Sequence, residues 1–139
     1  MKSFKTNLTA VILITVILLG ISCKKDSPSQ TKTTQEKLLG KWNLISGVDN
    51  DYYSGSSHIT TTTFLPGDYM EFKSDGTASN HQSGSVFTYD YGIVNDSKIW
   101  IGLPDQFYDL KILTETDLQF YQKNISGADY YESTTTLKK

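Results

Sequence analysis

Apolar and polar side chains alternate with a period of two along most of the chain beyond residue 40. Met70 and Phe72, for example, alternate with Tyr69, Glu71 and Lys73. This period is typical of half-buried strands, because successive side chains of a strand point to opposite faces of the sheet. Together with the turn residues between the runs, it predicts nine strands, over 41–48, 58–65, 68–74, 77–81, 85–94, 98–102, 107–114, 117–123 and 129–138.

Short turns separate these predicted strands, and helical periodicity is almost absent. Asp75-Gly76 is a strong hairpin signal, and Gly102-Leu103-Pro104-Asp105 breaks any strand. A helical pattern is confined to 36–39, which predicts one short turn before Gly40. Antiparallel strands in this number need closure to hide their edges, which an up-and-down barrel or a strongly curled sandwich achieves. We therefore predict an all-β fold, an up-and-down antiparallel barrel of about eight strands after a short helical turn.

The same alternation identifies the side chains expected to face the interior of the barrel. These are Trp42, Leu44, Val48, Phe87, Tyr89, Tyr91, Ile93, Tyr108, Leu110, Ile112, Leu118 and Phe120. Six of them form a candidate ligand cavity in which tyrosine hydroxyls serve as polar anchors: Phe87, Tyr89, Tyr91, Tyr108, Leu110 and Phe120. In the alternative interpretation, the same side chains meet at the centre and fill it, since eight strands enclose a space that suits either outcome.

The first 22 residues have the pattern of a secretory signal peptide. Lys2 and Lys5 precede an apolar stretch over 8–19, which is shorter than the roughly 20 residues needed to cross a bilayer. Polar residues begin abruptly at Lys24. A buried core helix is the alternative, and the terminal position with its flanking lysines argues against it.

Cys23 directly follows this segment, and Gly20-Ile21-Ser22-Cys23 resembles the lipobox of bacterial lipoproteins. The surrounding Ser-Cys-Lys-Lys-Asp is also similar to the start of many small lipoproteins from Bacteroidota. The resemblance implies a diacylglycerol thioether on Cys23 and an acyl chain such as palmitate on its amino group, which together anchor a protein stably. Because Lys24 follows the cysteine, it also implies export to the outer membrane, on a face that the sequence leaves open. The alternative is a free thiol in a secreted protein.

The remainder of the chain divides into a tether and one domain. Residues 24–35 are polar apart from one proline, so we expect the lipidated cysteine and a flexible tether over 23–35 and a folded domain over 36–139. The domain has eight lysines and fourteen acidic residues, a net charge of −6, and the whole chain lacks arginine. An acidic surface repels phosphate groups, so we expect no nucleic-acid partner and a membrane link through the lipid alone.

The start of the domain carries a family resemblance. Leu38-Leu39-Gly40-Lys41-Trp42 resembles the Gly-X-Trp opening of lipocalin-type barrels. The segment 71–77 resembles the next hairpin of small lipocalin-like lipoproteins, 108–120 their late hairpin, and 131–138 their closing strand. The resemblance covers nearly all of the domain and implies a lipocalin-like barrel.

In such barrels Gly40 and Trp42 would mark the closed end, with the Trp42 indole as the plug. Lipocalins stack an arginine from the last strand over this tryptophan. Since arginine is absent here, the candidates for that position are Lys123, Lys138 and Lys139.

Catalytic and metal-binding motifs are scarce. The sequence has no Gly-X-Ser-X-Gly, no Gly-rich phosphate loop and no His-Glu-X-X-His, so we expect neither enzyme activity nor a cofactor or metal. His58 and His81 lie in polar stretches. The simpler interpretation is that they are solvated loop histidines, and the functional alternative is that they form a ligand pair or act as a base. Asp49-Asn50-Asp51 starts like a calcium loop, but Ser54 and Thr60 stand where an EF-hand needs Gly and Glu, which leaves a looser cation site.

Tyr52-Tyr53 and Tyr130-Tyr131 suggest an exposed patch for a sugar or a protein, with simple edge packing as the alternative. The leading hypothesis is a non-enzymatic, membrane-tethered barrel that binds a small apolar or amphipathic ligand. The rival is a filled barrel that acts as a structural or interaction module of the cell envelope, through surface loops such as 49–58. A small hydrolase or isomerase would need an inward carboxylate or histidine, and the alternation places none there.

Overall fold

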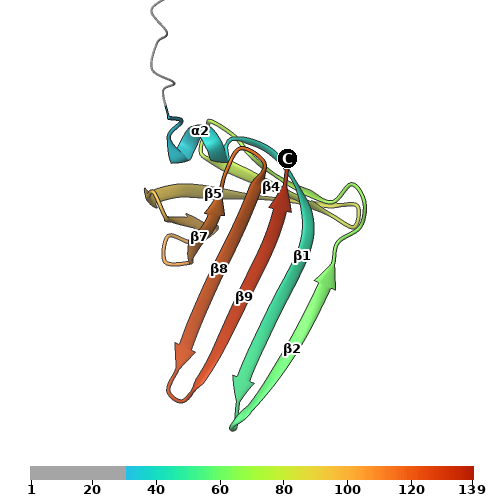
Figure 1. Cartoon of the computed structure of the whole chain (residues 1–139), viewed down its shortest axis with the longest axis vertical. Helices are drawn as coiled ribbons and strands as arrows, with labels where there is room; N and C mark the ends of the chain where they lie inside the picture. The colour runs from blue at the N-terminus through green and yellow to red at the C-terminus, as the bar shows by residue number, and fades with distance from the viewer. Residues whose placement is uncertain (1–30) are drawn as a thin grey trace, which may run out of the picture. The chain divides into compact units, whose positions relative to one another are not determined.

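The computed structural model describes residues 31–139, and these form one short helix followed by nine strands (Figure 1). The strands agree closely in number and position with those predicted from the alternation. The elements are α2 (Thr34–Leu38), β1 (Gly40–Tyr53), β2 (Ser56–Thr63), β3 (Tyr69–Phe72), β4 (Thr77–Gln82), β5 (Ser85–Asn95), β6 (Lys98–Ile101), β7 (Phe107–Leu113), β8 (Asp117–Ser126) and β9 (Asp129–Lys138).

Eight of the strands close into an antiparallel barrel. From β3 to β9 each strand pairs with the next one in the chain, and β1 closes the ring by pairing with both β3 and β9. The predicted up-and-down barrel of about eight strands is confirmed. The ninth strand, β2, lies outside the ring and pairs with β1.

Strand β1 changes its partner halfway along one edge. Residues Gly40–Asn43 pair with β3, whereas Ser46–Tyr53 pair with β2, and the opposite edge pairs with β9 throughout Asn43–Tyr52. As a result β2, β1, β9 and β8 run side by side past the short strands (Figure 1). We call these four strands the extended wall. Its β1–β2 hairpin occupies the segment 49–58 that we expected to be a surface loop, so that expectation is wrong.

The strand register shifts in β1, β5 and β7, and the bulges in β1 and β7 change the face of residues that were predicted to point inward. The pairing of β1 with β9 shifts between Leu44 and Ser46, so that Gly47 is buried while Val48, expected inside, is 41% exposed. A second shift, in β7, leaves Ile112 43% exposed and packs Leu113 against the core instead. The inward predictions for Val48 and Ile112 are therefore wrong, because one inserted residue moves every later side chain to the other face.

The closed end of the barrel is built around Trp42. Its ring is fully buried, and its indole N–H donates a hydrogen bond of 2.6 Å to the carbonyl oxygen of Leu38 at the end of α2. The Nζ of Lys139 lies 4.4 Å from the centre of the ring and donates to the Lys37 carbonyl oxygen at 2.8 Å. A lysine thus stands over the tryptophan. Of the other two candidates, Lys123 lies over Tyr130 and Lys138 pairs with Asp117.

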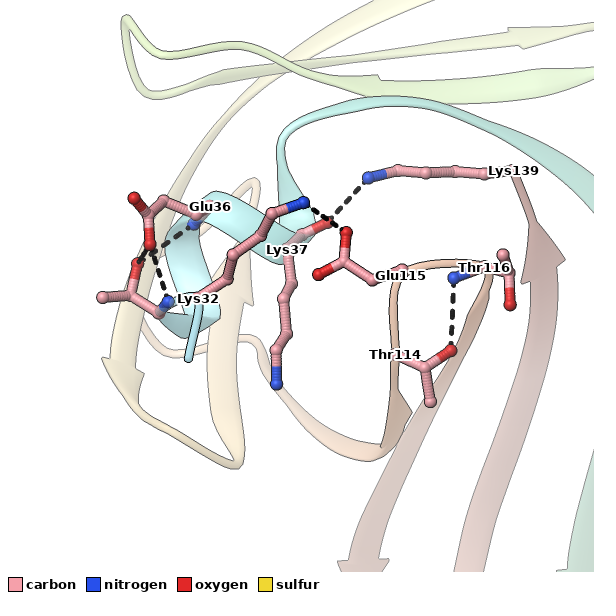
Figure 2. A network of polar contacts seen from close by, with 8 residues as sticks. Lys32, Glu36, Lys37, Thr114, Glu115, Thr116 and Lys139 are labelled. Carbon is pink, nitrogen blue, oxygen red and sulfur yellow. Dashed lines mark hydrogen bonds and ion pairs between the residues drawn. The ribbon is translucent and has the colours of Figure 1, made fainter. Parts of the chain in front are cut away.

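Polar contacts attach helix α2 to the closed end of the barrel (Figure 2). Thr33 and Glu36 form a capping box, in which the Thr33 N–H donates to the Glu36 carboxylate at 2.7 Å. The Lys32 ammonium pairs with Glu115 in the β7–β8 turn. The folded unit accordingly begins at Lys32, four residues before the predicted domain start, and the expected tether is shorter by those residues.

We predict that Trp42→Ala lowers the free energy of unfolding by about 3–5 kcal/mol, because it leaves a large void between α2 and the barrel. Urea denaturation followed by circular dichroism measures this change. Ile125→Ala, at a side chain that is 72% exposed, should change stability by less than about 0.5 kcal/mol. An equal effect of the two substitutions would contradict the role of Trp42 as the plug.

We also predict that acid weakens the attachment of α2. Hydrogen bonds from the Thr33 backbone and side chain lower the pKa of Glu36 below 4.5, and the hydrogen bond from Lys32 lowers the pKa of Glu115 in the same way. A carboxylate whose pKa is lower in the folded state stabilises the fold above its ordinary pKa, and this stability is lost as the pH falls through the lowered value.

The thermal midpoint should therefore fall as the pH drops below about 4.5. The double variant Glu36→Gln/Glu115→Gln should show a shallower fall. Part of the slope should remain, because the pKa values of Asp75 and Asp117 are lowered by their own hydrogen bonds from threonines. An unchanged slope in the double variant would show that these two carboxylates do not hold the helix.

Candidate functional site

An open cup of about 810 Å³ lies between the extended wall and the shorter strands. Its volume falls within the roughly 300–1,000 Å³ that is usual for small-molecule sites. The apolar part of the lining consists of Leu44, Phe64, Met70, Ile101, Leu103, Phe120 and Leu137. The polar part includes Asp49, Asn80, Gln82, Gln106, Tyr89, Tyr108, Tyr131 and Ser133.

Polarity increases along the cup from the plugged end toward the far end of the extended wall. Next to Trp42, Leu44 pairs with Leu137, and both side chains are buried. Farther along the same two strands the lining pairs become Gly47 with Thr135 and then Asp49 with Ser133. The cup therefore offers an apolar base and a hydrogen-bonding upper wall.

The six predicted cavity residues divide into three groups. Tyr89, Tyr108 and Phe120 line the cup, as expected. Tyr91 and Leu110 belong to the packed core instead; Tyr91 meets Phe72 edge-on at 5.1 Å and donates to the Lys73 carbonyl oxygen. The remaining residue, Phe87, is 54% exposed near the β4–β5 turn and is not part of the lining.

Most of the polar lining was missed by the alternation. Asp49 lies beyond the β1 bulge, which turns it inward although the alternation places it outside. Asn80 and Gln82 are polar residues at inward positions, and a period-two pattern counts such residues as solvent-facing. The chain carries no local signal for either effect, so sequence reasoning had no means of finding them.

Three tyrosines and one carboxylate face one another in the upper cup. The Tyr131 hydroxyl donates to Asp49 Oδ1 at 2.9 Å. Burial raises the pKa of Tyr131, a hydrogen bond with Ser133 opposes the rise, and the bond with Asp49 adds to it. The pKa of Tyr108 is raised by burial and then by the neighbouring Tyr131 and Tyr89 hydroxyls. Both shifts favour the uncharged phenol over the phenolate.

Asn80 contributes an unusual feature to the cup. Its Oδ1 is buried and has no hydrogen-bond partner among the described residues. A buried acceptor without a donor costs roughly 1–3 kcal/mol, so a donor supplied by a ligand would be favourable there. Lysine and histidine do not occur among the lining residues of the described chain.

The histidines and the acidic triplet give no metal site. His58 stacks on Tyr53 at 4.9 Å and His81 on Tyr69 at 4.1 Å, each in its own strand pair. Asp49-Asn50-Asp51 lies within β1 and not in a loop, with Asp49 and Asp51 on one face of the strand and Asn50 on the other. Within residues 31–139, groups of three or more His, Cys, Asp or Glu that suit a metal are absent.

The predicted tyrosine patch is divided between two faces of the extended wall. Tyr52 and Tyr130 pair across β1 and β9, and their rings stack at 4.9 Å. Tyr131 faces the other way, into the cup. A smaller cavity of about 290 Å³ at the tips of the extended wall is lined in part by Tyr52, Tyr53, Tyr130 and Ile125.

The predicted signal peptide and Cys23 lie outside the described residues. Helices with the length and apolarity needed to cross a membrane are not found within residues 31–139. Comparison with protein-family models gives no match for this chain, and comparison with curated proteins gives none either.

Proposed function

We propose that this chain is a membrane-anchored, lipocalin-like binding protein that holds one small amphipathic molecule in its cup. The observation that carries the proposal is the gradient inside the cup, from Leu44 and Leu137 at the plugged end to Asp49 and Ser133 above. An amphipathic molecule would bury its apolar body at the base and direct its polar group to the upper wall.

The filled-barrel alternative fits less well, because about 810 Å³ is far more than a packing defect. An enzymatic role also has little support. Burial raises the pKa values of Tyr108 and Tyr131, which disfavours their phenolate forms, and Asp49 Oδ1 is engaged by the Tyr131 hydroxyl. We therefore propose binding without catalysis.

The outer face of the extended wall supports a second, compatible candidate: contact with an envelope protein or glycan. Ile125, Tyr130 and Tyr52 occupy neighbouring positions across β8, β9 and β1. Ile125 is largely exposed, and the two tyrosine rings are stacked beside it. Aromatic and aliphatic side chains at such positions are typical of interaction surfaces.

Location at the outer membrane completes the proposal and depends on the lipobox-like sequence ending at Cys23. The folded unit begins at Lys32, which leaves residues 24–31 as the link to a lipid on Cys23. Two or more acyl chains would hold the barrel firmly at the membrane.

Blocking the cup tests the binding proposal. Ser133→Trp places a large ring on the face that lines the cup, whereas Thr134→Trp places the same ring on the outer face of β9. We expect naphthylmethanol, a neutral amphipathic probe, to bind the unaltered chain and the Thr134 variant, and Ser133→Trp to weaken its binding at least about tenfold through the loss of apolar burial.

Equilibrium dialysis against the chain in lipid nanodiscs, with empty nanodiscs as the blank, measures this binding. Saturable uptake that Ser133→Trp does not reduce would place the probe elsewhere. Absence of uptake by the unaltered chain would contradict the proposal.

Lipidation has its own test. Cells that express the chain and are fed an alkyne analogue of palmitate should label it, and Cys23→Ser should abolish the label and release the protein from the membrane fraction. Lys24→Ser, beside the same position, should retain the label. A labelled Cys23→Ser variant, or one that stays in the membrane, would refute an anchor at this residue.

A further inference from the structure

We infer that the cup selects ligands carrying a protonated amine over neutral or anionic ligands with the same apolar body. The inference rests on the proposed function and specifies the chemical class of the ligand. It follows from the charges, the hydrogen-bond acceptors and the shape of the cup.

The charge of the lining has one sign. Asp49 faces the cup from β1, and lysine and histidine are absent from the lining within the described chain. Asp51, one inward position beyond Asp49 on β1, adds a second carboxylate at the smaller cavity near the tips of the extended wall. A carboxylate ligand in this cup would be repelled by Asp49, whereas an ammonium group would be attracted.

Two hydrogen-bond acceptors of the lining are also available to a ligand. Asp49 receives a hydrogen bond from Tyr131 on Oδ1, and its other oxygen receives none from the described residues. Asn80 Oδ1, at another point of the lining, is buried and has no partner among the described residues. A ligand that brings N–H donors would be favoured at either acceptor. An ammonium group has three such donors, and hydrogen bonds between opposite charges are roughly twice as strong as neutral ones.

The aromatic residues favour the same charge. Tyr89, Tyr108 and Tyr131 line the cup together with Asp49, and the faces of aromatic rings attract cations. The chain already uses this interaction elsewhere, since Lys139 lies over Trp42 and Lys41 lies 3.6 Å from the centre of the Tyr69 ring.

The distance between the two ends of the cup sets the form of the ligand. Asp49 follows Leu44 by five positions on β1, which at about 3.3 Å per residue separates the apolar base from the carboxylate by roughly 15 Å. A ligand with a compact apolar body and a terminal amine fits this spacing. Naphthylmethylamine, naphthylmethanol and naphthoate share one body and carry a cationic, a neutral and an anionic head, so they isolate the effect of charge.

The test is equilibrium dialysis of these three probes against the full chain in lipid nanodiscs, with empty nanodiscs as the blank. We expect the amine to bind about tenfold more tightly than the alcohol, because a hydrogen bond between opposite charges is stronger than one between neutral groups, and the carboxylate to bind most weakly. Added salt should reduce the difference between the amine and the carboxylate.

Two variants that each remove one negative charge locate the effect. Asp49→Asn should lower the affinity for the amine about tenfold and leave that for the alcohol within about twofold, since the charge alone is removed. Glu132→Gln removes a carboxylate from the outer face of β9, where it pairs with Lys123, and should leave the ranking unchanged. The ranking measured on the unaltered chain remains decisive if either variant fails to fold.

The outcomes separate the two proposals. If the alcohol binds in the cup and the amine binds no better, the amine preference is refuted while the binding function stands. If naphthoate binds most tightly, the amine preference is likewise refuted and the binding function stands. If none of the three probes shows saturable binding, both proposals are refuted.

Discussion

The structure depends on one strand, β1, that pairs with two different strands along the same edge. The first four residues of β1 pair with β3, which closes the barrel. Residues Ser46–Tyr53 pair with β2, which does not belong to the ring. If β1 paired with β3 along its whole length, the barrel would be a uniform cylinder. Because β3 has four residues, the rest of β1 needs another partner for its backbone groups. The β1–β2 hairpin supplies that partner, and the resulting extended wall forms one side of the cup.

The end of the barrel at Trp42 is closed by contacts among residues from both ends of the folded unit. Trp42 reaches the carbonyl group of Leu38, and Lys139 covers the ring while donating to Lys37. Helix α2 has five residues and would not be stable alone, so its stability comes from these contacts and from its capping box. The lysine replaces the arginine that the lipocalin resemblance implies. It keeps the positive charge over the ring and loses the planar stacking surface.

The character of the cup arises from a small irregularity. The bulge after Leu44 exchanges the faces of β1, so that Asp49 enters the cup and Val48 leaves it. Without the bulge, Ser46, Val48 and Asn50 would continue the inward face of β1, and this strand would bring no charge into the cup. With it, a carboxylate joins three tyrosines in the lining of the cup, which also includes the unpartnered amide oxygen of Asn80. This arrangement supports an amphipathic ligand and favours a positively charged one.

The sequence by itself determined the strand positions, the turns and the all-β class. These follow from local rules, namely period-two alternation and Gly and Asp at tight turns, whereas the plug at Trp42 was implied by the resemblance of its Gly-X-Trp segment to lipocalin-type barrels. Tertiary structure alone decided the extended wall, the faces beyond the two bulges and the polar lining from Asn80 to Tyr131. Bulges and strand partners depend on pairings between segments far apart in the chain, and no local pattern encodes which strand an edge will meet.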